Sequence, residues 1–154
     1  MPKNFIAKLW HAVPASIRLW TLRISNARFT VTAGAVIFNA EGQVLLLKHP
    51  FRVGSGWGLP GGFLKQGEQP LEALRRELEE EIDLKVENVE FFWARSFKRP
   101  RQIEILFTAE TRALPQPQSM EVESAVWFNS NELPEGLPED QKALVQRAVE
   151  KRRV

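Results

Sequence analysis

Apolar residues follow a β-strand pattern from about residue 29 onward. Residues 30–38 and 43–48 are rich in β-branched and aliphatic side chains, and the Glu41-Gly42 pair between them is a turn signal. We therefore expect these two segments to form a β-hairpin. Three more segments have strand character, at residues 89–97, 102–111 and 124–128. Residues 49–58, with three glycines, and residues 114–119, with two prolines, are predicted loops.

Two other segments carry helical signals. Pro70 has the fixed φ that suits the first position of a helix. After it, large aliphatic side chains recur at three- and four-residue spacing and form one apolar stripe: Leu71, Leu74, Leu78 and Ile82. A second helix is predicted over residues 138–153, with acidic residues at its start and basic residues at its end, as the helix dipole favours.

The first 26 residues form a segment of different character, which predicts an N-terminal helical extension (residues 1–26) ahead of one domain (residues 27–154). Its apolar residues include two tryptophans, it is broken near Pro14, and no acidic residue precedes Glu41. No run reaches the ~18 apolar residues that a membrane span needs. An interfacial membrane helix is one alternative. We favour packing against the domain or a second subunit, and we expect a homodimer.

Composition narrows the class of protein. A chain of 154 residues suits one domain that buries its own core. The absence of cysteine excludes disulfides and thiolate metal sites and fits a reducing, cytoplasmic location. The net charge is only +2, and the basic residues are scattered, so the composition does not favour a nucleic-acid partner.

The candidate chemistry lies on the helix after Pro70. Glu77, Glu80 and Glu81 are three and four residues apart, so their carboxylates share one helix face. Like charges this close repel unless a cation lies among them. Hard oxygen ligands favour Mg²⁺, with Mn²⁺ as a possible substitute.

The charges around this face also allow a purely structural interpretation. Arg76 is placed to hold Glu68, at the helix entrance, by a bidentate contact. The alternative is a solvated helix face in which Glu72–Arg76 and Arg76–Glu80 are ordinary ion pairs four residues apart.

The segment Gly62–Leu84 resembles the Nudix box, Gly-x5-Glu-x7-Arg-Glu-(apolar)-x-Glu-Glu-x-Gly-(apolar). It matches at Gly62, Glu68, Arg76, Glu77, Leu78, Glu80, Glu81 and Leu84. The approach Trp57-Gly-Leu-Pro-Gly-Gly62 and the later Trp127-Phe128 are also similar to the family, so the likeness covers about residues 29–150. Asp83 stands where the family has glycine. Because that position ends the helix, we expect a positive φ there, which Asp tolerates better than most residues.

The resemblance implies an α/β fold, a Nudix-type α/β/α sandwich with a mixed central sheet. It also implies a hydrolase, similar to MutT, that uses Mg²⁺ to cleave a diphosphate linkage in a small nucleotide. The implied metal ligands are Glu77, Glu80, Glu81 and the backbone of Gly61, with Glu68 and Arg76 assisting. Family members often add a glutamate from outside the box. Glu121 and Glu123 are our candidates, and Glu104, inside a strand, is less favoured.

The substrate is less defined. Basic and aromatic residues that we expect to bind it, beside the glycines Gly61 and Gly62, are Arg52, Arg95, Arg99 and Trp57; Lys98, Arg101 and Phe97 are further options. Core packing is the alternative for the two aromatic side chains. Pro100, sixteen residues after Leu84, weakly favours ADP-ribose as the substrate.

Three functions stay open. We favour a hydrolase of ADP-ribose or nucleoside diphosphate sugars. The second is a house-cleaning pyrophosphatase for modified nucleoside triphosphates. The third is a non-catalytic binding module, which the intact cluster of glutamates argues against.

Overall fold

Strand β1 (Thr30–Phe38) lies at the centre of a mixed β-sheet. The computed structural model describes residues 13–17 and 28–153. On one edge, β1 pairs along its whole length, in parallel, with β6 (Gln102–Glu110). β6 then pairs antiparallel with β5 (Glu87–Phe97), which has two register irregularities.

The other edge of β1 is shared by two strands. β4 (Gly61–Phe63) pairs with its first half, and β2 (Val44–Lys48) meets its end at the single pair Phe38–Val44. β2 in turn pairs with β3 (Trp57–Gly58) and β7 (Ser124–Phe128). All of these pairings are antiparallel. The predicted hairpin is therefore confirmed, although its two strands pair with each other only next to the turn.

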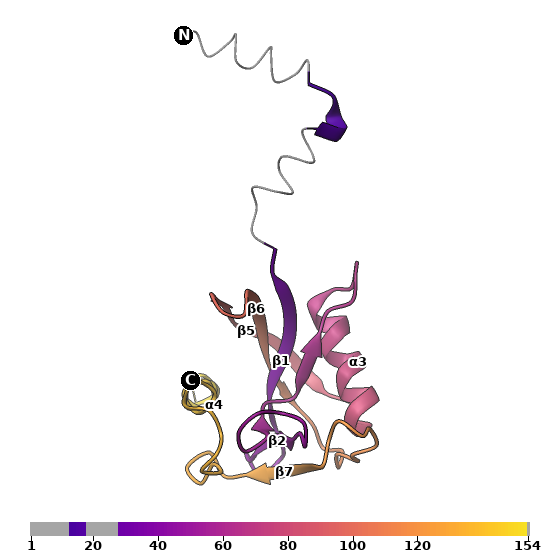
Figure 1. Cartoon of the computed structure of the whole chain (residues 1–154). Helices are drawn as coiled ribbons and strands as arrows, with labels where there is room; N and C mark the ends of the chain where they lie inside the picture. The colour runs from indigo at the N-terminus through magenta and orange to yellow at the C-terminus, as the bar shows by residue number, and fades with distance from the viewer. Residues whose placement is uncertain (1–12, 18–27, 154) are drawn as a thin grey trace.

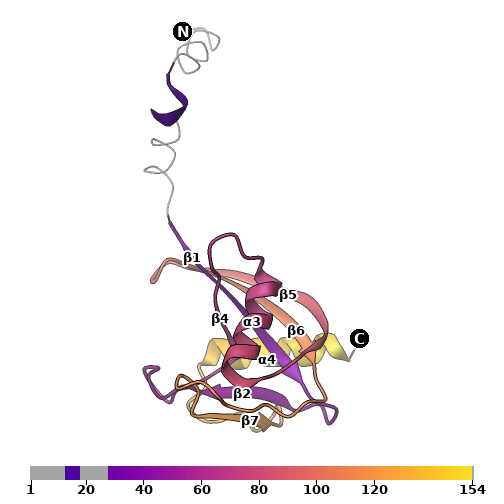
Figure 2. The ribbon, with the colours of Figure 1, turned by 90° about the vertical axis from the view of Figure 1, so that its right-hand side faces the viewer.

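One helix covers each face of the sheet, so the domain has three layers (Figures 1 and 2). α3 (Pro70–Ile82) lies on one face and α4 (Glu139–Arg152) on the other. This arrangement confirms the expected α/β/α sandwich with a mixed sheet.

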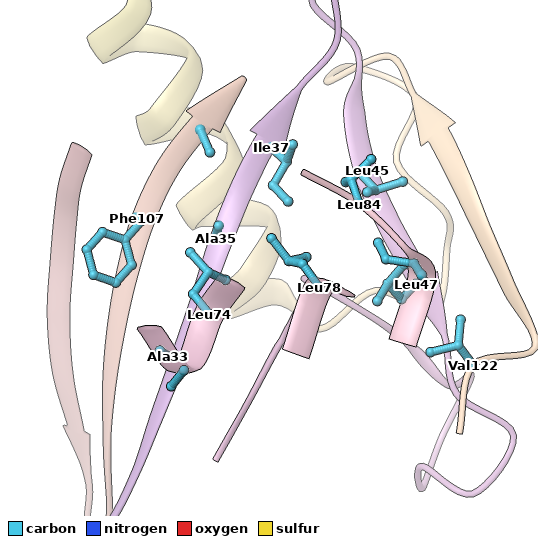
Figure 3. Close-up of a cluster of buried hydrophobic side chains, with 13 residues drawn as sticks. Ala33, Ala35, Ile37, Leu45, Leu47, Leu74, Leu78, Leu84, Phe107 and Val122 are labelled. Carbon is cyan, nitrogen blue, oxygen red and sulfur yellow. The ribbon is translucent and has the colours of Figure 1, made fainter. Parts of the chain in front are cut away.

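Alternation along β1 divides its side chains between two apolar cores. Ala33, Ala35 and Ile37 face α3 and contact its leucines (Figure 3). Val36 and Phe38 face α4 instead. A fully buried aliphatic side chain contributes about 1.5–3 kcal/mol through removal from water, so both helices are fixed on the sheet mainly by this burial.

The two ends of α3 are stabilised by different devices. At the start, the Gln69 backbone N–H donates to the Glu72 carboxylate at 3.0 Å. At the end, Asp83 has a left-handed backbone with φ of 47° and ψ of 45°, and its N–H donates to the Glu79 carbonyl at 3.2 Å. The positive φ expected at this position is confirmed.

Replacing Asp83 with Gly should raise the free energy of unfolding by a few tenths to about 1 kcal/mol. Glycine adopts this conformation without a Cβ penalty, and the change removes a negative charge from the negative end of the helix dipole. Urea unfolding of the two proteins measures the difference. Unchanged turnover is expected in the same variant, so a large loss of activity would contradict a purely structural role.

Two strands were not predicted. β3 has two residues and β4 has three, and three of these five residues are glycines: Gly58, Gly61 and Gly62. Such segments lack an alternating pattern, and they become strands only because β1 and β2 offer free edges.

Most of the N-terminal segment lies outside the described residues. Residues 15–17 are helical, directly after Pro14. The predicted extension and the homodimer stay predictions. Within the part of the chain that the structure describes, no helix is long and apolar enough to cross a membrane.

Candidate active site

The site is built where β4 passes beneath α3. Gly62 pairs with Ala33 of β1, and the missing side chain of Gly62 leaves room for the Glu77 carboxylate. A Cβ at position 62 would lie 2.2 Å from Cδ of Glu77. Gly61, with φ of 148°, approaches the backbone of β1 so closely that a Cβ there would lie 2.3 Å from the Ala33 carbonyl oxygen. Only glycine fits at these two positions.

Arg76 connects three of the glutamates. Its Nε and Nη2 donate to the two oxygens of Glu68 at 2.8 and 3.0 Å, which is the bidentate contact expected from the sequence. Nη1 donates to Glu77 at 2.7 Å and to Glu80 at 3.3 Å. Nη2 also donates to the Phe63 carbonyl at 2.9 Å, so the guanidinium ties α3 to β4. The hydrogen bonds from Arg76 lower the pKa of Glu68 to about 2, and the Lys65 backbone N–H and the Arg76 charge add to this effect.

Glu81 differs from its neighbours. Its side chain is only 7% exposed, and Oε2 is buried with no hydrogen-bond partner among the described residues. Burial raises the pKa of Glu81 to about 7, and the negative charges of Glu77 and Glu121 add to the rise. A buried carboxylate without a partner is costly, which is typical of functional sites.

The charge around α3 fits a divalent cation. Glu68, Glu77, Glu80 and Glu81 carry four negative charges when ionised, against the positive charges of Arg76 and Lys65, whose Nζ lies 3.5 Å from Glu80. Within residues 13–17 and 28–153, no three acidic or histidine side chains converge into a complete ligand cage. A closed cage is not required, because Mg²⁺ usually takes one or two carboxylates, several waters and substrate phosphates.

The raised pKa of Glu81 predicts a pH dependence of stability in metal-free protein. An acid whose pKa is about 7 in the folded state and 4.5 in the unfolded state binds more protons when folded. Its stabilising contribution is therefore complete below pH 4.5 and is lost as the pH rises through 7. With chelator present, the Glu81→Gln substitution should stabilise the protein more at pH 8 than at pH 5. The difference between its effects on the free energy of unfolding at the two pH values should be at most about 3 kcal/mol. Equal effects of the substitution at both pH values would contradict this.

The loop before β7 brings a further glutamate towards Glu81. Backbone N–H groups of Gln118 and Ser119 donate to the Glu81 carbonyl at 3.0 and 3.4 Å, so this loop covers the end of α3. Glu121 follows, exposed but near enough for its charge to raise the pKa of Glu81. Glu123, the other candidate in this loop, forms an ion pair with Lys48 at 3.3 Å.

A cavity of about 340 Å³ opens beside the two glycines. Arg52 lines it, and the Arg52 guanidinium lies directly over Gly58, where a Cβ would be 1.8 Å from Nη1. The other lining residues are Thr32, Ala33, Gly34, Leu59, Pro60, Gly61, Gly62, Phe63, Gln102, Glu104, Leu106 and Gln141. A volume of this size lies within the usual range for small-ligand sites.

The remaining predicted substrate contacts lie elsewhere. Arg95 forms ion pairs with Glu104 and, at 2.8 Å, with Asp140, and its guanidinium is over the Phe97 ring. Trp57 packs edge-on against Phe128, with ring centroids 5.2 Å apart, as the core-packing alternative had it.

In the described part of the chain, the cavity lining lacks one further predicted substrate contact, Arg99, and includes residues that the sequence patterns did not indicate. Arg99 lies on the exposed turn between β5 and β6 and is not among the described residues that line the cavity. Sequence reasoning missed Phe63, Gln102 and Gln141, which do line it. Phe63 lies in β4, Gln102 in β6 and Gln141 in α4, so no local sequence pattern connects the three residues.

Comparisons with known proteins identify the family. The NUDIX domain family model matches residues 28–148. The chain is 29% identical over 113 residues to the NAD-capped RNA hydrolase NudC of Photobacterium profundum, which covers 71% of this chain and 42% of that protein. It is 33% identical over 97 residues to the NudC of Chromobacterium violaceum, which covers 62% and 36%. The chain thus spans less than half the length of these curated relatives.

A solved structure agrees. The NUDIX hydrolase from Nitrosomonas europaea is 26% identical, with a TM-score of 0.72, over 83% of this chain and 74% of that one. Sequence and fold lead to one conclusion: the chain belongs to the Nudix pyrophosphohydrolase family.

Proposed function

We propose that this protein uses Mg²⁺ to hydrolyse a diphosphate linkage in a nucleoside diphosphate derivative of the ADP-ribose or nucleoside diphosphate sugar type. The observation that carries the proposal is the buried, unpartnered oxygen of Glu81, one helical turn after Glu77, whose carboxylate lies against Gly62 of β4. A binding module with no reaction to perform would have no reason to retain such a costly carboxylate.

Glu77, Glu80 and Glu81 would hold the cation, with the Gly61 carbonyl as a further ligand. Mn²⁺ would serve as a substitute, because it favours the same oxygen ligands. When bound, the cation would contact the diphosphate oxygens, lower the pKa of a water molecule and stabilise the charge on the departing phosphate. Arg76 would act by orienting Glu68, as their bidentate contact supports.

The cavity beside Gly61 and Gly62 would receive the substrate. Gly61 lets the backbone approach phosphate oxygens closely, and Arg52 supplies a positive charge to them. The lining also includes Gln102 and Gln141, which offer amide groups for a nucleoside, and Glu104, which is paired with Arg95. The cavity therefore combines a cationic side chain with amide groups, as a nucleotide with a charged diphosphate and a polar nucleoside requires.

Glu121 is our candidate for the group that accepts a proton from the attacking water. It lies near enough to Glu81 to influence its pKa, and its side chain is exposed. The other two candidates are occupied, Glu123 by Lys48 and Glu104 by Arg95. A candidate base must be free to receive the proton, and only Glu121 meets this condition among the three.

The named relatives support a diphosphate over a triphosphate substrate. Both are NAD-capped RNA hydrolases by name, and NAD joins two nucleosides through a diphosphate. A substrate panel with Mg²⁺ tests the proposal, using ADP-ribose, a nucleoside diphosphate sugar, NAD and a modified nucleoside triphosphate. We expect a nucleoside monophosphate and a phosphorylated second product from one of the first three.

The controls identify the alternatives. The Glu81→Gln protein measures background hydrolysis, and Glu79→Gln, an exposed change on the same helix, controls for loss of charge. Inorganic pyrophosphate released from the triphosphate alone would favour the house-cleaning function. Tight binding of a nucleotide with no turnover in Mg²⁺ or Mn²⁺ would favour the binding module.

A further inference from the structure

His49, the residue after β2, is a half-buried polar side chain that the proposed reaction does not use. Its Nδ1 lies 2.9 Å from the backbone oxygen of Glu121. Because a carbonyl can only accept, Nδ1 carries the proton in this contact. Nε2 is buried and has no partner among the described residues. Burial and the nearby Arg52 charge lower the pKa of His49, which favours the neutral ring.

A second set of contacts fixes the chain just after Glu121. The Glu123 N–H donates to the Lys48 carbonyl at 2.7 Å, and the two side chains form an exposed ion pair. Val122 is 5% exposed and inserts into the core beneath α3 (Figure 3). The end of β2 therefore holds the loop on both sides of Val122.

The other end of the same loop is fixed to helix α3. Gln118 and Ser119 donate to the Glu81 carbonyl, and the Ser119 hydroxyl accepts from the Glu121 N–H at 3.2 Å. The backbone of Glu121 is thus held from two directions, by Ser119 on its N–H and by His49 on its carbonyl. Ser119 is itself hydrogen-bonded to the Glu81 carbonyl, and His49 directly follows β2.

We propose that His49 is a positioning residue that fixes the Glu121 backbone beside Glu81 during hydrolysis. The proposal rests on the proposed role of Glu121. His49 provides the one side-chain contact described for the Glu121 carbonyl, and it comes from a strand end that the core holds rigidly. Without it the glutamate would sample positions away from the attacking water, and a displacement of about 1 Å can cost a hundredfold in rate.

Three substitutions separate the contact from the bulk of the ring. His49→Asn keeps an N–H donor at the position of Nδ1, His49→Gln carries its donor one bond further out, and His49→Ala has none. We expect kcat to fall at least tenfold in the Ala and Gln proteins, with KM within about twofold of wild type. The Asn protein should stay within about threefold in kcat. Thermal unfolding of all four proteins checks that they are folded.

Lys48→Met is the matched control. It removes the exposed ion pair with Glu123 but leaves the His49 contact in place. Exposed pairs contribute little to stability, so kcat should stay within about twofold. Loss of kcat in this control equal to that of His49→Ala would overturn the proposal, because general loosening of the loop would then explain both. Failure of Asn to restore kcat would also overturn it.

A double-mutant cycle with Glu121→Gln tests the route of the effect. If His49 acts through Glu121, the double variant His49→Ala/Glu121→Gln should be no slower than Glu121→Gln alone. Multiplication of the two losses would overturn the proposal while leaving the role of Glu121 intact. Wild-type kcat in Glu121→Gln would instead remove Glu121 from the reaction, and the His49 proposal with it, while hydrolysis itself would stand.

Discussion

Replacing Glu81 with Gln should lower kcat by several orders of magnitude while the fold survives. The amide has the same shape but no negative charge, so it is a poor ligand for a divalent cation. The Oε2 atom of Glu81 is buried and unpartnered among the described residues, which leaves it free for such a ligand. Hydrolysis rates in saturating Mg²⁺ and circular dichroism of both proteins measure the effect.

Glu79→Gln is the control for this substitution. Glu79 is exposed on the same helix, so kcat should be unchanged when its charge is removed. A Glu81→Gln protein that retained more than about a tenth of the wild-type rate would contradict the assigned role. A tenfold loss corresponds to about 1.4 kcal/mol of transition-state stabilisation, which is too little for a central metal ligand.

Replacing Gly62 with Ala should reduce kcat at least a hundredfold. The new methyl group would lie 2.2 Å from Cδ of Glu77, so the carboxylate must move away from β4. That movement also disturbs Arg76, which donates to Glu77 at 2.7 Å and to Glu68. Because several charged groups are displaced together, we expect weaker Mg²⁺ binding as well, measured by calorimetry and by the Mg²⁺ dependence of the rate.

Gly67→Ala provides the comparison, in the turn between β4 and α3. Gly67 has φ of 82°, so alanine is strained there, but its Cβ would meet nothing within 4 Å. This variant should lose about 1 kcal/mol of stability with little change in kcat. Similar losses of activity in the two glycine variants would show that loop strain, and not the Glu77 contact, controls the rate.

The sequence predicted the elements that carry their own pattern. The ranges expected for β1 and β7 agree with the structure, and α3 begins at Pro70 as the proline indicated. Burial on both faces made β1 a continuous apolar run. Where no pattern exists, as in β3 and β4, pairing depends on a free edge supplied by distant residues, which a local reading cannot detect.

The candidate site was predictable to the same degree. Spacing alone brought Glu77, Glu80 and Glu81 to one helix and paired Arg76 with Glu68. It could not distinguish the glutamates from one another, because the burial of Glu81 depends on its tertiary surroundings. The roles of Arg95 and Trp57 were open for a similar reason: their contacts come from α4 and β7, far along the chain.

The short pairing between β4 and β1 acts as an alignment device for the chemistry. Three residue pairs set it, and the Leu64 N–H to Val31 carbonyl and Ala35 N–H to Pro60 carbonyl contacts, both 3.0 Å, fix its two ends. Side chains alternate between faces, so a slip by one residue would turn Phe63 or Gly61 towards Glu77. Length changes at the exposed residues 53–54, in the loop between β2 and β3, should leave this alignment untouched. A single residue inserted within β4 would shift the pairing between β4 and β1. The protein should therefore tolerate insertions in the first segment and lose activity on insertion in the second, although the two segments are close in the sequence.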